Sequence, residues 1–109
     1  MRRGDVVLVS APGDFGKPRP ATIVQSDLFN ETHASIVVCL MTSDLQDAPL
    51  FRISVTPSDE NGLAQASQIM VDKPVALHRE RIAAHIGRLD EDTMVQVARS
   101  LALFLGIAR

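Results

Sequence analysis

The hydrophobic pattern of this 109-residue chain changes its period at Leu89, and this change constrains the fold more than any other feature. Before Leu89, apolar residues fall in short runs separated by glycine, proline and small polar residues. After Leu89, they recur every three or four positions, which is the spacing of one face of an α-helix. The pattern therefore predicts several short strands followed by one C-terminal helix.

Six runs before Leu89 have the length and composition of β-strands. They cover residues 5–10, 21–26, 35–42, 51–56, 63–71 and 83–89. Residues 51–56 show the clearest alternation, because Phe51, Ile53 and Val55 alternate with polar residues, as in a strand with one buried face. Residues 11–18 and 57–62 are rich in turn formers, and residues 27–34 read as a polar connection.

The C-terminal helix has recognisable start and stop signals. Asp90 suits the N-cap position, Glu91 and Asp92 suit the positive end of the helix dipole, and Gly106 can close the helix in the left-handed conformation. We expect this helix over about residues 91–105. The fold class predicted for residues 1–109 is one mainly β domain, in which a small, strongly bent antiparallel sheet or barrel over about residues 4–89 packs against this helix.

The cysteine and histidine content limits metal and disulfide chemistry. Cys39 is the only cysteine, so an intramolecular disulfide and a cysteine-based zinc site are excluded. No two of His33, His78 and His85 have metal-ligand spacing. We therefore expect no metal and no other cofactor, and we expect Cys39 to be a buried, inert thiol.

Charge and hydropathy bear on partners and location. The formal net charge of −2 argues against a non-specific nucleic-acid coat but leaves room for a local basic site. The apolar runs are too short to span a bilayer. Met1, Arg2 and Arg3 are followed at once by Asp5, which interrupts an export signal. We expect a cytoplasmic protein that does not associate with membranes.

The densest cationic segment is Lys17, Pro18, Arg19 and Pro20. The two prolines stiffen the backbone and would present the Arg19 guanidinium from a fixed frame. Its planar fork can donate two parallel hydrogen bonds to a phosphate. The alternative is a solvated loop cation, which is the commoner situation for a surface arginine.

Two further pairs of polar residues lie on predicted strands. Thr42 and Ser43 follow the third strand, where hydroxyls could orient a phosphate, although local turn capping is the commoner role. Ser67 and Gln68 lie within the fifth strand, where they could line a groove, although facing solvent is the commoner situation for polar side chains.

Five segments of the chain together resemble the MazF/PemK toxin family, in the order expected for that family. They are residues 3–9, the element Gly16-Lys17-Pro18-Arg19-Pro20-Ala21, then Met41-Thr42-Ser43, Ala66-Ser67-Gln68-Ile69 and Ile86-Gly87-Arg88-Leu89. The Gly-x-x-Arg-Pro-Ala element is the most specific of these. The resemblance extends over nearly the whole chain.

This resemblance implies an SH3-like barrel with a C-terminal helix, a homodimer, and metal-independent, sequence-selective cleavage of single-stranded RNA through attack by a ribose 2′-hydroxyl. It also implies a cognate antitoxin whose acidic, disordered C-terminal segment occupies the RNA groove, with DNA contacted only through that antitoxin. By motif position, Arg19 and Thr42 match the catalytic arginine and threonine of the family. The residues expected along the RNA path are Lys17, Ser43, Arg52, Ser67 and Gln68.

The chain also departs from the family pattern, which keeps two alternatives open. Many relatives carry an acidic residue where this chain has Ser67, so a catalytically silent binding or autoregulatory module of the same fold is one alternative. The other is a CcdB-like poison of DNA gyrase, which residues 24–27 and 104–107 resemble. Against it, those toxins present a tryptophan where this chain has Leu105.

Overall fold

The computed structural model describes residues 1–11, 13 and 17–108. Over these residues the chain forms β1 (Asp5–Val9), β2 (Arg19–Ile23), α1 (Asp27–Asn30), β3 (Ser35–Thr42), β4 (Arg52–Val55), β5 (Ser67–His78), a 3-10 turn (Arg79–Arg81), β6 (Ile82–Arg88) and α2 (Glu91–Phe104). The predicted mainly β fold with one C-terminal amphipathic helix is confirmed.

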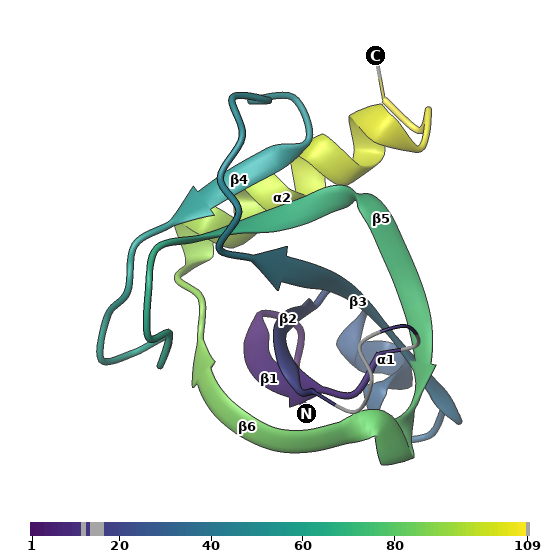
Figure 1. Ribbon diagram of the computed structural model, residues 1–109. Coiled ribbons are helices and arrows are strands. Elements are labelled where there is room, and N and C mark those ends of the chain that lie inside the picture. The colour runs from purple at the N-terminus through teal and green to yellow at the C-terminus, as the bar shows by residue number, and fades with distance from the viewer. Residues whose placement is uncertain (12, 14–16, 109) are drawn as a thin grey trace.

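The strands form one six-stranded sheet in the order β4-β5-β3-β2-β1-β6. Every neighbouring pair is antiparallel. The sheet curls so that β5 and β6 sweep around β1, β2 and β3, while α2 runs behind β4 and β5 (Figure 1). The edge strands β4 and β6 do not pair with each other, so the molecule is barrel-like without a closed ring of strands.

A sharp bend in β5 produces much of this curvature. Cys39 on β3 pairs with Pro74, whereas Met41 pairs with Ile69, so residues 70–73 of β5 stand opposite residue 40 alone. An excess of residues on one strand bends it and increases its twist. The predicted fifth strand at residues 63–71 was therefore misplaced, since β5 begins at Ser67 and continues through Pro74 to His78.

The loop between β4 and β5 lies against β6 and fills part of the gap between the sheet edges. The backbone N–H of Arg88 donates a 2.7 Å hydrogen bond to the carbonyl of Glu60. If Gly87 carried a Cβ atom, that atom would lie 2.3 Å from the carbonyl group of Asn61. A Cβ atom on Gly62, which has a φ of +69°, would lie 2.0 Å from the backbone of β6. Only glycine permits two backbones to approach so closely.

The interior consists of two hydrophobic clusters on opposite faces of the central strands. One contains Val6 of β1 and Val97 of α2, and the other contains Val7 and Val9 of β1. Successive side chains of a strand point to opposite faces, so β1 contributes to both clusters.

Cys39 is fully buried in the first cluster, as predicted. Burial, together with the nearby charge of Asp72, raises the pKa of its thiol to about 12.

The helix ends follow the predicted signals. Asp90 caps α2 by accepting hydrogen bonds from the hydroxyl and the backbone N–H of Thr93, and these bonds lower the pKa of its carboxyl. Gly106 adopts a φ of +77° after the last turn.

The short helix α1 was not predicted. It is organised by Asn30, a buried residue whose amide bonds to Gln25 and Asp27. Among the described residues, none of the helices has the length and apolarity needed to cross a membrane.

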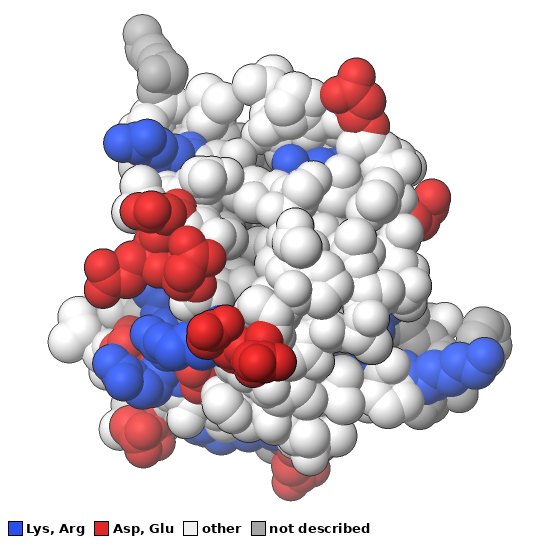
Figure 2. Space-filling view, turned by 90° about the vertical axis from the view of Figure 1, so that its left-hand side faces the viewer, with Lys and Arg blue, Asp and Glu red and all other residues white. Residues whose placement is uncertain are grey.

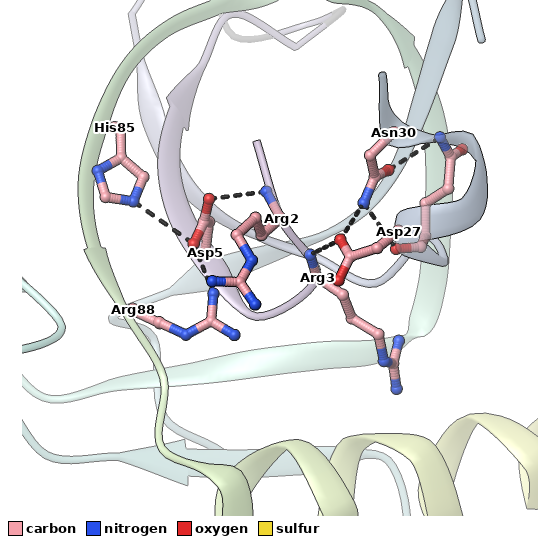
Figure 3. Close-up of polar contacts among 8 residues, drawn as sticks. Arg2, Arg3, Asp5, Asp27, Asn30, His85 and Arg88 are labelled. Carbon is pink, nitrogen blue, oxygen red and sulfur yellow. Dashed lines mark hydrogen bonds and ion pairs between the residues drawn. The ribbon is translucent and has the colours of Figure 1, made fainter. Parts of the chain in front are cut away.

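Two carboxylates anchor the N-terminus beside β1 (Figure 3). Asp5 accepts hydrogen bonds from the backbone N–H of Arg2 at 2.8 Å and from Nη1 of Arg88 at 2.9 Å, and Nε2 of His85 lies 3.5 Å from its Oδ1. Asp27 accepts a 2.7 Å bond from the backbone N–H of Arg3. This bond, with one from Asn30, lowers the pKa of Asp27. The start of β1 is thereby tied to β6 and α1.

Candidate active site

A pocket of about 210 Å³ lies where β2 begins, β3 ends and the chain enters β5. It is lined by Arg19, Pro20, Met41, Thr42, Ser43, Leu63, Ala64, Gln65 and Ser67. Four residues predicted from the sequence to belong to the site, Arg19, Thr42, Ser43 and Ser67, therefore meet in one cavity. They come from three separate segments of the chain.

The strand register explains why Arg19 and Thr42 meet. Ala21 of β2 pairs with Leu40 of β3. The start of β2 and the end of β3 therefore lie at the same end of this antiparallel pair, and Arg19 and Thr42 are each two residues beyond its last paired residues. Thr42 in turn pairs with Gln68 of β5. Directly opposed residues on antiparallel strands project from the same face of the sheet. Thr42 and Gln68 consequently project from the same face, at the end of the sheet where Arg19 begins β2.

The hydroxyl of Thr42 has a fixed local partner. The backbone N–H of Asp44 donates a 3.1 Å hydrogen bond to Thr42 Oγ1. Because a hydroxyl carries one proton and two acceptor positions, this contact leaves the Thr42 proton available for donation. The turn-capping role weighed from the sequence is thus present, and it is compatible with binding an anion in the pocket.

Ser67 and Gln68 do not face solvent, so that part of the sequence interpretation was wrong. They are 5% and 6% exposed. The Ser67 hydroxyl donates to the carbonyl of Gln65 at 3.0 Å. Within the described lining of the pocket there is no aspartate, glutamate or histidine. The arrangement offers a guanidinium and several hydroxyls, which suit an anionic, hydroxyl-bearing substrate.

Arg52 and Gln68 lie beside the pocket and are absent from its lining. Nη1 of Arg52 donates a 3.2 Å hydrogen bond to Oε1 of Gln68, so the two predicted RNA-path residues bind each other. Their contact with RNA stays a prediction. Sequence reasoning selected both residues but could not show that they pair, because they lie on different strands.

Lys17 is exposed and lies two residues before Arg19. Residues 12 and 14–16 of the preceding segment, which include Gly16 of the Gly-x-x-Arg-Pro-Ala element, lie outside the described residues. Figure 2 shows a face on which acidic and basic side chains mix along one side and a broad central area carries little charge. No stripe of positive charge crosses the part of the molecule seen on that face.

A larger hollow of about 850 Å³ lies elsewhere, between β4, the β4–β5 loop and the start of α2. Its walls include Ser54, Glu60, Arg88, Asp90 and Thr93, and sequence reasoning did not anticipate it. The motif residues converge in the smaller pocket, so chemistry rather than size identifies the candidate active site. Among the described residues, no group of three or more His, Cys, Asp or Glu side chains is arranged to hold a metal.

The chain is similar to known proteins over almost its whole length. A sequence model of the family described as PemK-like, MazF-like toxin of type II toxin–antitoxin system matches residues 2–105. The chain is 45% identical to a probable endoribonuclease MazF of Mycolicibacterium smegmatis over 99% of both chains. It is 23% identical to the endoribonuclease EndoA of Bacillus subtilis, over 98% of this chain and 96% of that protein.

Solved structures show the same fold. A mycobacterial endoribonuclease in complex with its cognate antitoxin superimposes with a TM-score of 0.84 at 22% identity, over 100% of this chain and 98% of that one. A MazE–MazF structure from Deinococcus radiodurans gives 0.80 at 20% identity, over 99% and 97%. The gyrase-poison alternative is not favoured by these matches. The chain belongs to the family of PemK-like, MazF-like toxins of type II toxin–antitoxin systems.

Proposed function

We propose that this protein is the toxin of a type II toxin–antitoxin system and cleaves single-stranded RNA at selected sequences without a metal ion. The observation that carries the proposal is the convergence of Arg19 and Thr42 in one pocket. Family membership and the 45% identity to a probable endoribonuclease support it.

The proposed reaction is an in-line transfer within the RNA backbone. The ribose 2′-oxygen forms a bond to the adjacent phosphorus and the bond to the 5′-oxygen breaks, which leaves a 2′,3′-cyclic phosphate and a 5′-hydroxyl. The 2′-hydroxyl gives up its proton and the leaving oxygen gains one. Negative charge grows on the non-bridging oxygens, where the Arg19 guanidinium would stabilise it by about 3 kcal/mol. Thr42 would donate its free hydroxyl proton to the same phosphate.

In this mechanism the protein accelerates cleavage by stabilising the developing negative charge and by positioning the RNA. An arginine is a poor general base, and the described lining of the pocket contains no carboxylate or imidazole. In this proposal, Ser43 and Ser67 contact the sugar or phosphate groups next to the scissile bond, and Lys17 contacts a neighbouring phosphate. Such phosphate contacts make RNA binding weaken as salt rises.

The partners that we propose are those of the toxin in a type II toxin–antitoxin system. We propose that a cognate antitoxin with an acidic, disordered C-terminal segment covers the pocket, and that DNA is reached only through it. A mycobacterial endoribonuclease of the same fold has been solved with its cognate antitoxin, which supports an antitoxin as a partner. We further propose that the toxin acts in the cytoplasm.

We also propose a homodimer, and the exposed apolar residues near the C-terminus offer a surface for it. Leu103, Phe104 and Leu105 are 45%, 51% and 55% exposed, and Ile107 is more exposed still. Leu50 of the β3–β4 loop is also exposed, and Ser100 binds its carbonyl at 2.9 Å, which places this loop beside α2. Several exposed large apolar residues in one region of a chain are typical of protein interfaces.

The proposed function is tested by incubating the purified protein with a long single-stranded RNA in EDTA and mapping new 5′ ends. Discrete cuts at a recurring short sequence, bearing 5′-hydroxyls, are the expected result. Intact RNA from a folded protein would contradict the proposal. Inhibition of gyrase by that same preparation would then support the gyrase poison in its place.

A further inference from the structure

The β3–β4 loop, which begins at Ser43 directly after Thr42, is held to the sheet by the buried side chain of Gln68. Gln68 Oε1 accepts a 3.0 Å hydrogen bond from the backbone N–H of Gln46, and Gln68 Nε2 donates a 2.9 Å bond to the carbonyl of Gln46. This reciprocal pair imitates the hydrogen bonding between two strands. The Gln68 carboxamide thus holds the loop as an additional strand would.

Arg52 adds a second fastening closer to the pocket. Its Nη1 donates to the carbonyl of Asp44 at 3.1 Å and to Gln68 Oε1 at 3.2 Å. Asp44 is the residue whose backbone N–H binds the Thr42 hydroxyl. A continuous chain of hydrogen bonds therefore runs from Gln68 through Arg52 and Asp44 to Thr42.

The side chain of Gln68 is bonded within the protein, and unlike Ser67 it does not line the pocket. Its side chain is directed to Gln46, Arg52 and, at 3.4 Å, to the hydroxyl of Ser54, and the residue is only 6% exposed. An amide can donate two hydrogen bonds and accept two. Both acceptor positions and both donor positions of Gln68 have partners, so direct recognition of RNA would require breaking internal bonds.

We infer that Gln68 and Arg52 are positioning residues, which hold the segment from Thr42 to Gln46 so that the Thr42 hydroxyl stays aimed into the pocket. The inference rests on the proposed ribonuclease function. It differs from a role in contacting RNA, because positioning residues affect the rate of cleavage and leave ground-state binding nearly unchanged.

The test compares Gln68→Leu with Gln46→Ala, its matched control. Leucine removes all of the amide bonds at similar volume, whereas Gln46→Ala leaves them intact because Gln68 binds only the backbone of residue 46. Two quantities are measured for each variant. They are the single-turnover rate on a cleavable RNA, and the affinity for the same sequence with a 2′-deoxyribose at the cut, which cannot undergo 2′-hydroxyl attack.

Gln68→Leu is expected to slow cleavage roughly tenfold to a hundredfold, the scale of a misplaced catalytic group. Affinity for the 2′-deoxy RNA should stay within about twofold, and Gln46→Ala should behave as wild type. An unchanged rate in Gln68→Leu would overturn the inference. So would an affinity loss that matches the loss in rate, because that result would identify Gln68 as an RNA contact.

Arg52→Met provides a second variant should Gln68→Leu fail to fold. It removes the bonds to Asp44 and Gln68 from a half-buried side chain, and it should give the same slower cleavage at unchanged affinity. Wild-type affinity combined with a wild-type rate in Arg52→Met would also overturn the inference. If the wild-type protein cleaves no RNA, both the proposed function and this inference are wrong. If the wild-type protein cleaves RNA and Gln68→Leu cleaves it equally fast, only this inference is wrong.

Discussion

Arg19, which begins β2, and Thr42, which ends β3, line the same pocket. The pairing of the two strands brings these ends together, since Ala21 pairs with Leu40. A one-residue slip would turn one of the two side chains to the opposite face of the sheet. The sheet pairing therefore determines whether the two groups can act on one phosphate.

The role of the Thr42 hydroxyl is tested by Thr42→Val, which keeps the branched shape and removes the oxygen. Cleavage should fall by about a hundredfold, the scale for losing one hydrogen-bond donor to developing charge. Thr42→Ser should retain most activity. The control is Thr32→Val, the same change at an exposed position before β3. Full cleavage by Thr42→Val in a single-turnover assay would remove Thr42 from the mechanism.

Gly87 tests the close approach of the β4–β5 loop to β6. Gly87→Ala would place a Cβ atom 2.3 Å from the Asn61 carbonyl, and we expect it to lower the free energy of unfolding by about 3 kcal/mol. Gly106→Ala meets no atom within 4 Å and should cost only about 1 kcal/mol, from its left-handed backbone. Urea unfolding measures both variants, and equal losses would contradict the contact.

Because Cys39 is buried, we expect the free energy of unfolding to decline at alkaline pH. Burial and the charge of Asp72 raise the pKa of its thiol from 9.0 to about 12, so above about pH 9 the unfolded chain releases the proton while the folded chain keeps it. The free energy of unfolding should therefore fall as pH rises from 9 towards 12, by about 1 kcal/mol at pH 10. The chain has no tyrosine to titrate in this range.

The measurement for Cys39 is urea unfolding at pH 8 and pH 10, with Cys39→Ala as the comparison. The alanine variant should lose less stability between the two pH values than wild type, although it is less stable at both. Parallel losses in the two proteins would show that the thiol does not titrate as described.

The proposed dimer surface is tested by Phe104→Asp. Phe104 is 51% exposed in the single chain, and a carboxylate there would have to be desolvated in an apolar interface. We expect wild type to sediment as a dimer at micromolar concentration and Phe104→Asp to sediment as a monomer. Leu28→Asp, at an exposed position on α1, is the control and should remain dimeric. A dimeric Phe104→Asp would place the interface elsewhere.

The sequence was most informative where local chemistry decides the structure. The N-cap at Asp90, the left-handed Gly106 and the bounds of β3 follow from short-range signals, and all three are as predicted. The predicted end of the fifth strand at Val71 was wrong, because β5 continues through Asp72, Lys73 and Pro74. In the structure the same residues bend β5 within the sheet, which depends on its pairing with β3.

The candidate site also contains some features that the sequence predicted and others that it could not predict. Arg19, Thr42, Ser43 and Ser67 were selected from motifs, and they share a pocket. The burial of Gln68 and its bonds to the backbone of Gln46 could not be predicted, because they join a loop to a strand distant in sequence. Such contacts are set by the tertiary fold and leave no periodic trace in the sequence.

The most direct test of the proposed ribonuclease site is the cleavage rate of Arg19→Ala on an RNA oligonucleotide that wild type cuts, measured in EDTA. Arg99→Ala, the same change at an exposed position on α2, is the control. Arg19→Ala is expected to remain folded and dimeric and to lose cleavage by about a thousandfold, while Arg99→Ala cuts at the wild-type rate. Cleavage by Arg19→Ala at the wild-type rate would contradict the assignment of this pocket as the active site.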